Sequence, residues 1–405
     1  MSAVITFDHL DVVFGPEPKS VIPMLDQGLD RATILERAGH VVGVRDANMT
    51  VARGEIAVLM GLSGSGKSSL LRCVNGLNAI TRGKLVVDVG DGAPINVAAA
   101  SKQEMRRLRT RQVAMVFQQF ALLPWRTVAE NVGFGLEMRG VNKAEADAII
   151  RDKLAMVGLA NWADKFAHEL SGGMQQRVGL ARAFATDAPV LLMDEPFSAL
   201  DPLIRDRLQD ELLELQRTLQ KTILFVSHDL DEAMKLGNCI AIMESGVIVQ
   251  QGTPEDIVLN PTDDYVADFV AHMNPLNVLR GGSLMCPVER LPRGANGDRS
   301  LDDAGIACAA IDAAGLCTGA SLGGQPVPVG EAKPISLAKE GDTGPRFRGQ
   351  HGTLAVASTD ITMREVIALR RQTGLPVLLE ENGKVVGAVR DQDIFAALSG
   401  AREKS

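Results

Sequence analysis

Short apolar segments alternate along the chain with amphipathic stretches. Residues 206–219, for example, have the pattern of an amphipathic helix. Uninterrupted apolar runs of strand length are typical of strands that are buried on both faces of a parallel sheet. The pattern therefore predicts an α/β fold whose strands coincide with five such runs, at residues 56–60, 113–117, 190–193, 223–227 and 239–243.

The pattern changes twice along the chain. Residues 119–180 are mostly helical in pattern and lack a buried-strand run, which predicts a helical insertion in an α/β domain that spans residues 1–272. Residues 273–352 are rich in Gly, Pro, Ala and small polar residues and have weak periodicity, so we expect an irregular linker. Residues 353–400 predict a small α+β domain in the order strand, helix, strand, strand, helix.

This C-terminal domain has more apolar side chains than so small a unit buries alone. A single strand-helix-strand-strand-helix unit leaves one face of its sheet uncovered. We therefore expect the unit to pair with its copy from a second subunit through Ile361, Val366, Leu369, Leu375, Val377 and Leu379.

Composition limits the classes of protein that fit. The 405 residues are 46% hydrophobic and carry a formal net charge of -8, which argues against a broad basic surface for nucleic acid or anionic lipid. The five cysteines form no CxxC pair, so we expect no zinc site. No run of 18 apolar residues occurs, so other chains are expected to supply any membrane-spanning helices.

The first candidate site follows residues 56–60, where the sequence GLSGSGKSS leads into a helical pattern. This is the strand, GxxxxGK[ST], helix order of a P-loop, in which glycines let backbone N–H groups surround a phosphate. Lys67 is expected to reach the β and γ phosphates, and the hydroxyl of Ser68 is expected to bind Mg²⁺. The candidate nucleotide-binding residues are Gly61, Ser63, Gly64, Ser65, Gly66, Lys67, Ser68 and Ser69.

A second candidate site follows residues 190–193, which place Asp194 and Glu195 at the carboxyl end of a predicted strand. Ligands of α/β sheets bind at this edge. We expect Asp194 to hold Mg²⁺ through water and Glu195 to act as the general base toward the attacking water. An acidic helix start after a buried strand is common, so the catalytic interpretation depends on the accompanying P-loop.

A third motif, LSGGMQQR at residues 170–177, opens another predicted helix. Ser171 is a good N-cap, and Gly172 and Gly173 expose N–H groups that suit a phosphate. One nucleotide rarely needs two such loops from one chain. We therefore expect a head-to-tail dimer, in which Lys67 of one subunit and Ser171 and Gly173 of the other bind the same γ-phosphate.

With these motifs, residues 1–272 resemble the ATP-binding subunit of ABC transporters. The resemblance implies ATP and Mg²⁺ as cofactors and an antiparallel β subdomain beside the α/β core. It implies that Gln118 senses the γ-phosphate and Mg²⁺, with Gln119 as a competing register, and that His228 contacts the γ-phosphate. Met174 stands where many members have Gln, a departure that leaves the expected activity unchanged.

The same resemblance assigns two further residues. Asp201 belongs to a loop at residues 198–201 that crosses to the partner's site, and Phe14 stands where the family stacks an aromatic ring on adenine. A core position is the alternative for Phe14. The last 50 or so residues resemble a single half of a CBS-type domain, as a regulatory or merely dimerising module.

A long insertion between Phe14 and the P-loop narrows the resemblance to the ATPases of glycine betaine, proline betaine and choline importers. This implies an ATP-hydrolysing homodimer, peripheral on the cytoplasmic face of the inner membrane, that powers import of a quaternary ammonium compound. Its partners would be transmembrane permease subunits and, indirectly, a periplasmic or lipid-anchored substrate-binding protein. The alternative is a soluble ABC ATPase acting on nucleic acid, which needs a basic channel or zinc modules that the sequence lacks.

Overall fold

The computed structural model describes residues 2–118, 121–198, 200–271, 276, 278–294, 297–332 and 349–399. The chain divides into two compact units. The first comprises Met1–Ile257 and Pro261–Val270, and the second comprises Val258–Asn260 and Ala271–Ser405. Among the described residues, no helix combines the length and the apolar character needed to cross a bilayer.

The first unit contains a six-stranded sheet in the order β10-β9-β3-β8-β7-β6, parallel except for the edge strand β10. The five predicted strands are confirmed, because continuous apolar runs suit strands that are covered on both faces. The bounds are β3 Ile56–Met60, β6 Val113–Val116, β7 Val190–Asp194, β8 Thr222–Val226, β9 Cys239–Glu244 and β10 Val247–Gly252.

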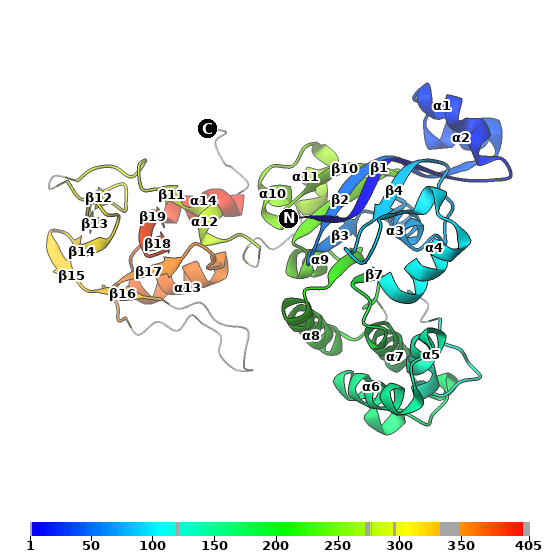
Figure 1. Cartoon of the computed structure of the whole chain (residues 1–405). Coiled ribbons are helices and arrows are strands. Elements are labelled where there is room, and N and C mark those ends of the chain that lie inside the picture. Colours follow the sequence, from blue (N-terminus) through cyan, green and yellow to red (C-terminus); the bar gives the residue numbers. More distant parts are fainter. Residues whose placement is uncertain are drawn as a thin grey trace. The chain divides into compact units, whose positions relative to one another are not determined.

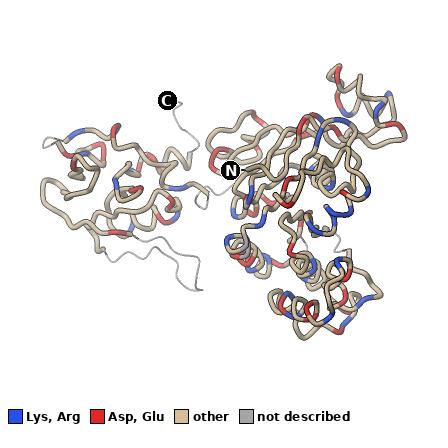
Figure 2. Tube along the Cα trace, in the orientation of Figure 1, with Lys and Arg blue, Asp and Glu red and all other residues tan. Residues whose placement is uncertain are grey.

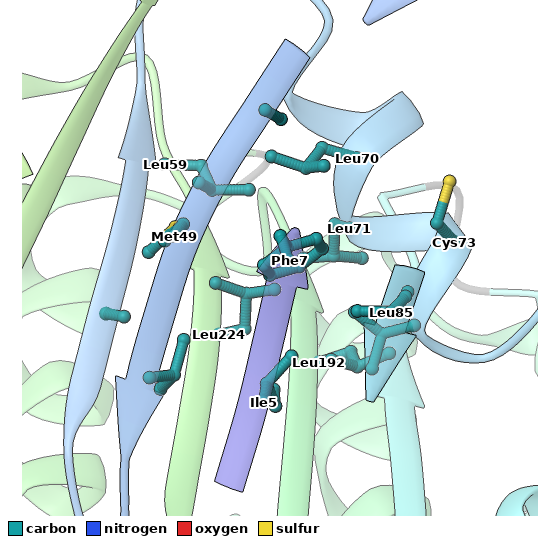
Figure 3. Packing of buried hydrophobic residues seen from close by; sticks show 14 of the residues in the cluster. Ile5, Phe7, Met49, Leu59, Leu70, Leu71, Cys73, Leu85, Leu192 and Leu224 are labelled. Atoms are coloured by element: carbon teal, nitrogen blue, oxygen red, sulfur yellow. The ribbon is translucent and has the colours of Figure 1, made fainter. Parts of the chain in front are cut away.

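A second, antiparallel sheet of this unit has the order β2-β1-β4-β5. Its apolar face shares one buried core with the parallel sheet and helix α3, as Figure 3 shows for Phe7, Leu59 and Leu70. This is the antiparallel β subdomain that the family resemblance implies. The bounds are β1 Ala3–Phe14, β2 Val41–Ala52, β4 Arg82–Val87 and β5 Ile95–Asn96.

The insertion between β1 and β2 is a small helical element at the end of the β1–β2 ribbon (Figure 1). It consists of η1 Pro18–Val21, α1 Ile22–Asp26 and α2 Arg31–Ala38. Val21, Leu25 and Ile34 of the insertion form an apolar cluster with Val13 of β1 and Val42 of β2.

Helices complete the first unit. The segment for which a helical insertion was predicted contains α5 and α6, which pack on each other and on α7 (Figure 1). A capping box of Thr127 and Glu130 begins α5, and Gly140 in the left-handed conformation ends it. The bounds are α3 Lys67–Val74, α4 Lys102–Arg107, α5 Val128–Arg139, α6 Lys143–Met156, α7 Gly172–Ala185, α8 Pro202–Leu219, α9 Leu230–Leu236, α10 Pro254–Leu259 and α11 Asp264–Val270, with short turns η2 Val97–Ala99, η3 Leu108–Gln112, η4 Ala160–Trp162 and η5 Ala167–Glu169.

The second unit is built on a five-stranded sheet in the order β11-β19-β18-β17-β16. The predicted succession of strand, helix, strand, strand, helix is observed from β17 to α14. One face of the sheet packs with the helices around Ala355, Val377 and Leu379. The bounds are β11 Cys286–Pro287, β16 Val329–Glu331, β17 Leu354–Ser358, β18 Val377–Glu381, β19 Lys384–Val389, α12 Gly281–Leu284, α13 Met363–Thr373 and α14 Asp391–Ser399.

The structure corrects the expectation of an irregular linker at residues 273–352. This segment supplies both edge strands of the five-stranded sheet, β11 and β16, and forms a four-stranded antiparallel sheet of its own. These strands escaped prediction because they are short, half-exposed and rich in Ala, Gly and Ser. They are β12 Arg299–Ser300, β13 Ala307–Ile311, β14 Cys317–Leu322 and β15 Gln325–Val327.

The four-stranded sheet also corrects the expectation of an uncovered apolar face. Leu301, which follows β12, and Ala309 of β13 pack with Leu354 and Leu378 on the second face of the five-stranded sheet. The six apolar residues that were expected to need a second subunit are all buried inside the unit itself. This face of the sheet is therefore covered within the chain, and the unit does not need a second copy to bury it.

Candidate nucleotide-binding and catalytic site

The P-loop connects β3 to α3, and its conformation requires glycine. Gly61, Gly64 and Gly66 have φ values of 140°, 81° and 104°, which side chains rarely adopt. A Cβ atom on Gly66 would lie 2.3 Å from the carbonyl oxygen of Gly43 in β2. The loop is thereby packed directly on the antiparallel sheet, and no larger residue fits at Gly66.

Lys67 is the buried cation of this loop. Its Nζ donates hydrogen bonds to the carbonyl oxygens of Gly61, at 2.8 Å, and Leu62, at 2.9 Å. Burial lowers the pKa of the ammonium group, while the nearby charges of Glu195 and Asp194 raise it. The ammonium is thus held beside the loop that is expected to surround the phosphates, close to both carboxylates.

Asp194, at the end of β7, is fully buried and joined to helix α3. One carboxylate oxygen accepts a hydrogen bond from the hydroxyl of Ser68 at 2.7 Å. The other accepts two from Arg72, from Nε at 3.1 Å and from Nη2 at 2.8 Å. Sequence reasoning missed Arg72, although its position one helical turn after Ser68 places both residues on one face of α3.

Three loops meet at the carboxylate of Glu195. The same oxygen, Oε2, lies 3.0 Å from Nε2 of Gln118 and 3.2 Å from Nδ1 of His228. The backbone of Glu195 has a φ of 48°, an uncommon left-handed conformation for a residue with a side chain. The structure thus brings together Gln118, Glu195 and His228, whereas the competing Gln119 lies outside the described residues.

The oxygen ligands offered by Ser68, Asp194 and Gln118 suit a magnesium ion. Ser68 offers a hydroxyl, Asp194 a carboxylate and Gln118 an amide, and Mg²⁺ prefers such hard oxygen ligands. Among the described residues, no cluster of three or more His, Cys, Asp and Glu side chains could hold a metal. This sparse protein set fits an ion that takes its remaining ligands from phosphate oxygens and water.

The third motif begins helix α7, where the hydroxyl of Ser171 accepts a hydrogen bond from the N–H of Met174 at 3.4 Å. Ser171 and Gly172 are exposed and Gly173 is half-buried. Asp201 similarly caps α8 by accepting from the N–H of Ile204 at 3.1 Å. The predicted N-cap at Ser171 is observed, and the cap at Asp201 is a further finding. No hydrogen bond among the described residues joins Ser171 to the P-loop of its own chain.

Phe14 lies at the end of β1, and its side chain is 39% exposed. It packs beside Gly43, where a Cβ atom would lie 2.6 Å from the ring. The ring therefore lies at the surface rather than in the core, so it is accessible to a flat ligand.

A buried polar network supports the loop that carries His228. The carboxyl group of Glu232 accepts a hydrogen bond from Nε2 of Gln209 at 3.0 Å and lies 2.5 Å from the hydroxyl of Ser227. Arg205 binds Asp229 at 3.2 Å and the carbonyl oxygen of Leu200 at 3.3 Å. Burial raises the pKa of Glu232, against the lowering effect of the two hydrogen bonds.

Comparison with known proteins agrees with this geometry. The model of the ABC transporter family matches residues 44–198. The glycine betaine/carnitine transport ATP-binding protein GbuA of Listeria monocytogenes is 38% identical over 98% of both chains. The chain belongs to the ATP-binding proteins of the ABC transporter family.

Other members of this ABC family match about two thirds of the chain. The glycine betaine/proline betaine transport system ATP-binding protein ProV of Escherichia coli is 49% identical over 66% of each chain. The fold is also similar to the ATP-binding cassette MJ0796, solved as a dimer in a post-hydrolysis state bound to ADP and Pi. The TM-score is 0.53 and the identity 26%, over 62% of this chain and 98% of that one.

Proposed function

We propose that this ABC protein hydrolyses ATP to power the import of a quaternary ammonium compound, choline or glycine or proline betaine, through separate permease subunits. The observation that carries the ATPase proposal is the carboxylate of Glu195, held at the end of β7 by Gln118 and His228. The proposed class of substrate rests on relatives named for glycine betaine, carnitine, proline betaine and choline.

The residues support an in-line attack of water on the γ-phosphate. Glu195 accepts a proton from the attacking water, and His228 and Gln118 orient its carboxylate. Lys67 and the N–H groups of the P-loop stabilise negative charge on the phosphates. When Mg²⁺ is bound, Ser68, Asp194 and Gln118 would hold it, and it would neutralise further phosphate charge.

A second copy of the chain would complete the site. The exposed turn of Ser171, Gly172 and Gly173 suits a phosphate bound to the partner's P-loop, and Asp201 would lie at the same interface. Phe14 would stack on the adenine ring. The dimeric state of the similar cassette MJ0796 supports this arrangement.

The transport role places the protein at a membrane without crossing it. We propose a peripheral position on the cytoplasmic face, bound to the permease, with a substrate-binding protein acting on the other side. The strand, helix, strand, strand, helix succession from β17 to α14 supports a CBS-like C-terminal unit. The alternative of an ATPase acting on nucleic acid is not supported, because Lys and Arg are interspersed with Asp and Glu along both units (Figure 2).

Replacement of the general base tests the proposal. Glu195→Gln should lower ATP turnover by about 10²- to 10⁴-fold, because the amide cannot accept the proton, while nucleotide binding survives. Phosphate release and calorimetric ATP binding measure the two quantities. Glu214→Gln, an exposed carboxylate on α8, is the matched control and should keep full turnover. Turnover above a tenth of wild type in Glu195→Gln would rule out the assignment.

A further inference from the structure

Two arginines of the antiparallel sheet hold the insertion between β1 and β2 in place. Arg45 of β2 donates hydrogen bonds to the carbonyl oxygens of Leu25, at 2.9 Å, and Leu29, at 3.3 Å. Arg82 of β4 bridges Asp26 of the insertion and the buried Asp11 of β1, at 2.5 and 2.6 Å. The connection between α1 and α2 is thereby held in place relative to the antiparallel sheet, on which the P-loop packs.

The connection between α1 and α2 leads to Arg31, whose side chain contacts the P-loop. Asp30 caps α2 by accepting from the N–H of Thr33 at 2.7 Å, and Arg31 follows as the first residue of the helix. Nη1 of Arg31 donates a hydrogen bond to the carbonyl oxygen of Gly64 at 3.1 Å. The insertion therefore contacts the loop whose N–H groups are expected to face the phosphates.

The charge of Arg31 is not balanced within the described part of the chain. The side chain is half-buried, and no Asp or Glu among the described residues forms an ion pair with it. Burial lowers the pKa of its guanidinium group. A partly desolvated cation without a carboxylate is unfavourable unless an anion reaches it, and the neighbouring site is built for a polyanion.

We propose that Arg31 binds the phosphate chain of the nucleotide, so that the insertion between β1 and β2 forms part of the ATP site. This inference rests on the proposed ATPase function and assigns the insertion a role in it. The carbonyl of Gly64 engages one N–H of the planar guanidinium, which leaves donors for phosphate oxygens. Such charge-assisted hydrogen bonds are among the stronger ones in proteins.

The expected consequence is on affinity rather than on chemistry. Arg31 has no contact with Glu195, Gln118 or His228 and takes no part in moving the proton. An interaction of equal strength with bound ATP and with the transition state lowers KM and leaves kcat unchanged. Loss of Arg31 should therefore raise KM and leave kcat unchanged.

The test measures nucleotide affinity and turnover separately. In full-length protein carrying Glu195→Gln, Arg31→Gln should raise the calorimetric Kd for ATP by about 5- to 20-fold. In the otherwise wild-type chain, Arg31→Gln should raise KM to a similar extent and leave kcat within about twofold. The difference in Kd should shrink only modestly when KCl is raised, because salt screens a half-buried charge in part.

Two matched variants make the result decisive. Arg37→Gln removes an exposed arginine from the last turn of the same helix and should leave Kd unchanged. Arg31→Lys keeps the charge but loses the planar set of N–H donors, so its Kd for ATP should lie between those of wild type and Arg31→Gln. An unchanged Kd in Arg31→Gln, or a loss in Arg31→Lys as large as in Arg31→Gln, would overturn the proposal. Absence of hydrolysis in the wild-type chain would instead contradict the proposed function.

Discussion

Two adjacent carboxylates at the end of β7 are held in opposite ways. Asp194 is buried, and both of its oxygens are engaged, by Ser68 and by the guanidinium of Arg72. Glu195 is contacted by an amide and an imidazole on a single oxygen, which leaves its other oxygen free of hydrogen bonds from the described side chains. The first carboxylate is thus charge-balanced in advance, whereas the second retains a site for a proton.

The ion pair of Arg72 and Asp194 predicts a link between stability and Mg²⁺. Arg72→Leu should destabilise the nucleotide-free protein by about 1–3 kcal/mol, a value reduced because Arg72 is partly exposed. Mg-ATP should then raise the melting temperature more than it does in wild type, since the metal supplies the missing positive charge. Thermal shift assays in a Glu195→Gln background measure both effects, with the exposed Arg217→Leu as control. An equal shift in variant and wild type would contradict this.

At the scale of elements, helix α8 and the loop before α9 are joined by buried polar groups. Gln209 of α8 binds Glu232 of α9, which lies against Ser227, the residue before His228. Arg205 connects Leu200, in the loop expected to cross to the partner, with Asp229. These contacts connect the loop at residues 198–201 with the loop that carries His228, within one chain.

The raised pKa of Glu232 predicts a pH dependence of stability. An acid whose pKa is higher in the folded than in the unfolded state binds more protons when folded. The protein therefore loses stability as pH rises from the unfolded value near 4.5 through the folded pKa. Glu232→Gln preserves the shape and cannot ionise, so its melting temperature should exceed that of wild type increasingly over this range. A difference that is independent of pH would show that the carboxyl group ionises as readily when folded.

The sequence predicted elements whose signal is local and missed contacts that depend on tertiary structure. Strands β3, β7 and β8 are continuous apolar runs, and the P-loop is a single continuous sequence motif. The sequence therefore predicted the strands and the P-loop. Strand β14 has the sequence CTGASL, in which every position is half-exposed or exposed, so it carries no comparable signal. Arg31 and Glu232 lie far in sequence from Gly64 and Gln209, and nothing in their own neighbourhoods indicates those partners.

At the scale of the whole molecule, each unit has a core of its own, and the residues proposed to bind nucleotide all lie in the first. The second unit is a five-stranded sheet covered on both faces by segments of the same chain. Its folding therefore does not require a partner subunit. The first unit, in contrast, exposes Ser171 and Gly172 in a form that a second copy would use.

Mixed dimers test the composite site. A Lys67→Ala subunit combined with a Ser171→Arg subunit places both lesions in one site and leaves the other intact. The mixture should recover ATPase activity above either variant alone, measured as phosphate release after heterodimers are confirmed by differential tagging. If purified heterodimers had no more ATPase activity than either variant alone, the result would contradict independent head-to-tail sites.

The second unit offers a stability prediction. Leu301→Ala removes a fully buried side chain between the two sheets and should destabilise this unit by about 2–5 kcal/mol. The exposed Leu316→Ala is the control. Calorimetry should show a lower unfolding temperature for the second unit, while ATP affinity stays at the wild-type value. A weaker affinity for ATP in Leu301→Ala than in wild type would contradict the separation of the two cores.

The left-handed backbone of Glu195 has an evolutionary consequence. A residue with a side chain costs about 1–2 kcal/mol in this conformation, whereas glycine adopts it freely and asparagine tolerates it. Selection for stability alone would therefore favour replacement of Glu195, whereas the proposed role as general base would retain it. In a duplicated copy of this chain released from the need to hydrolyse ATP, this position would be expected to change earlier than Gly61, Gly64 and Gly66, whose conformation still favours glycine.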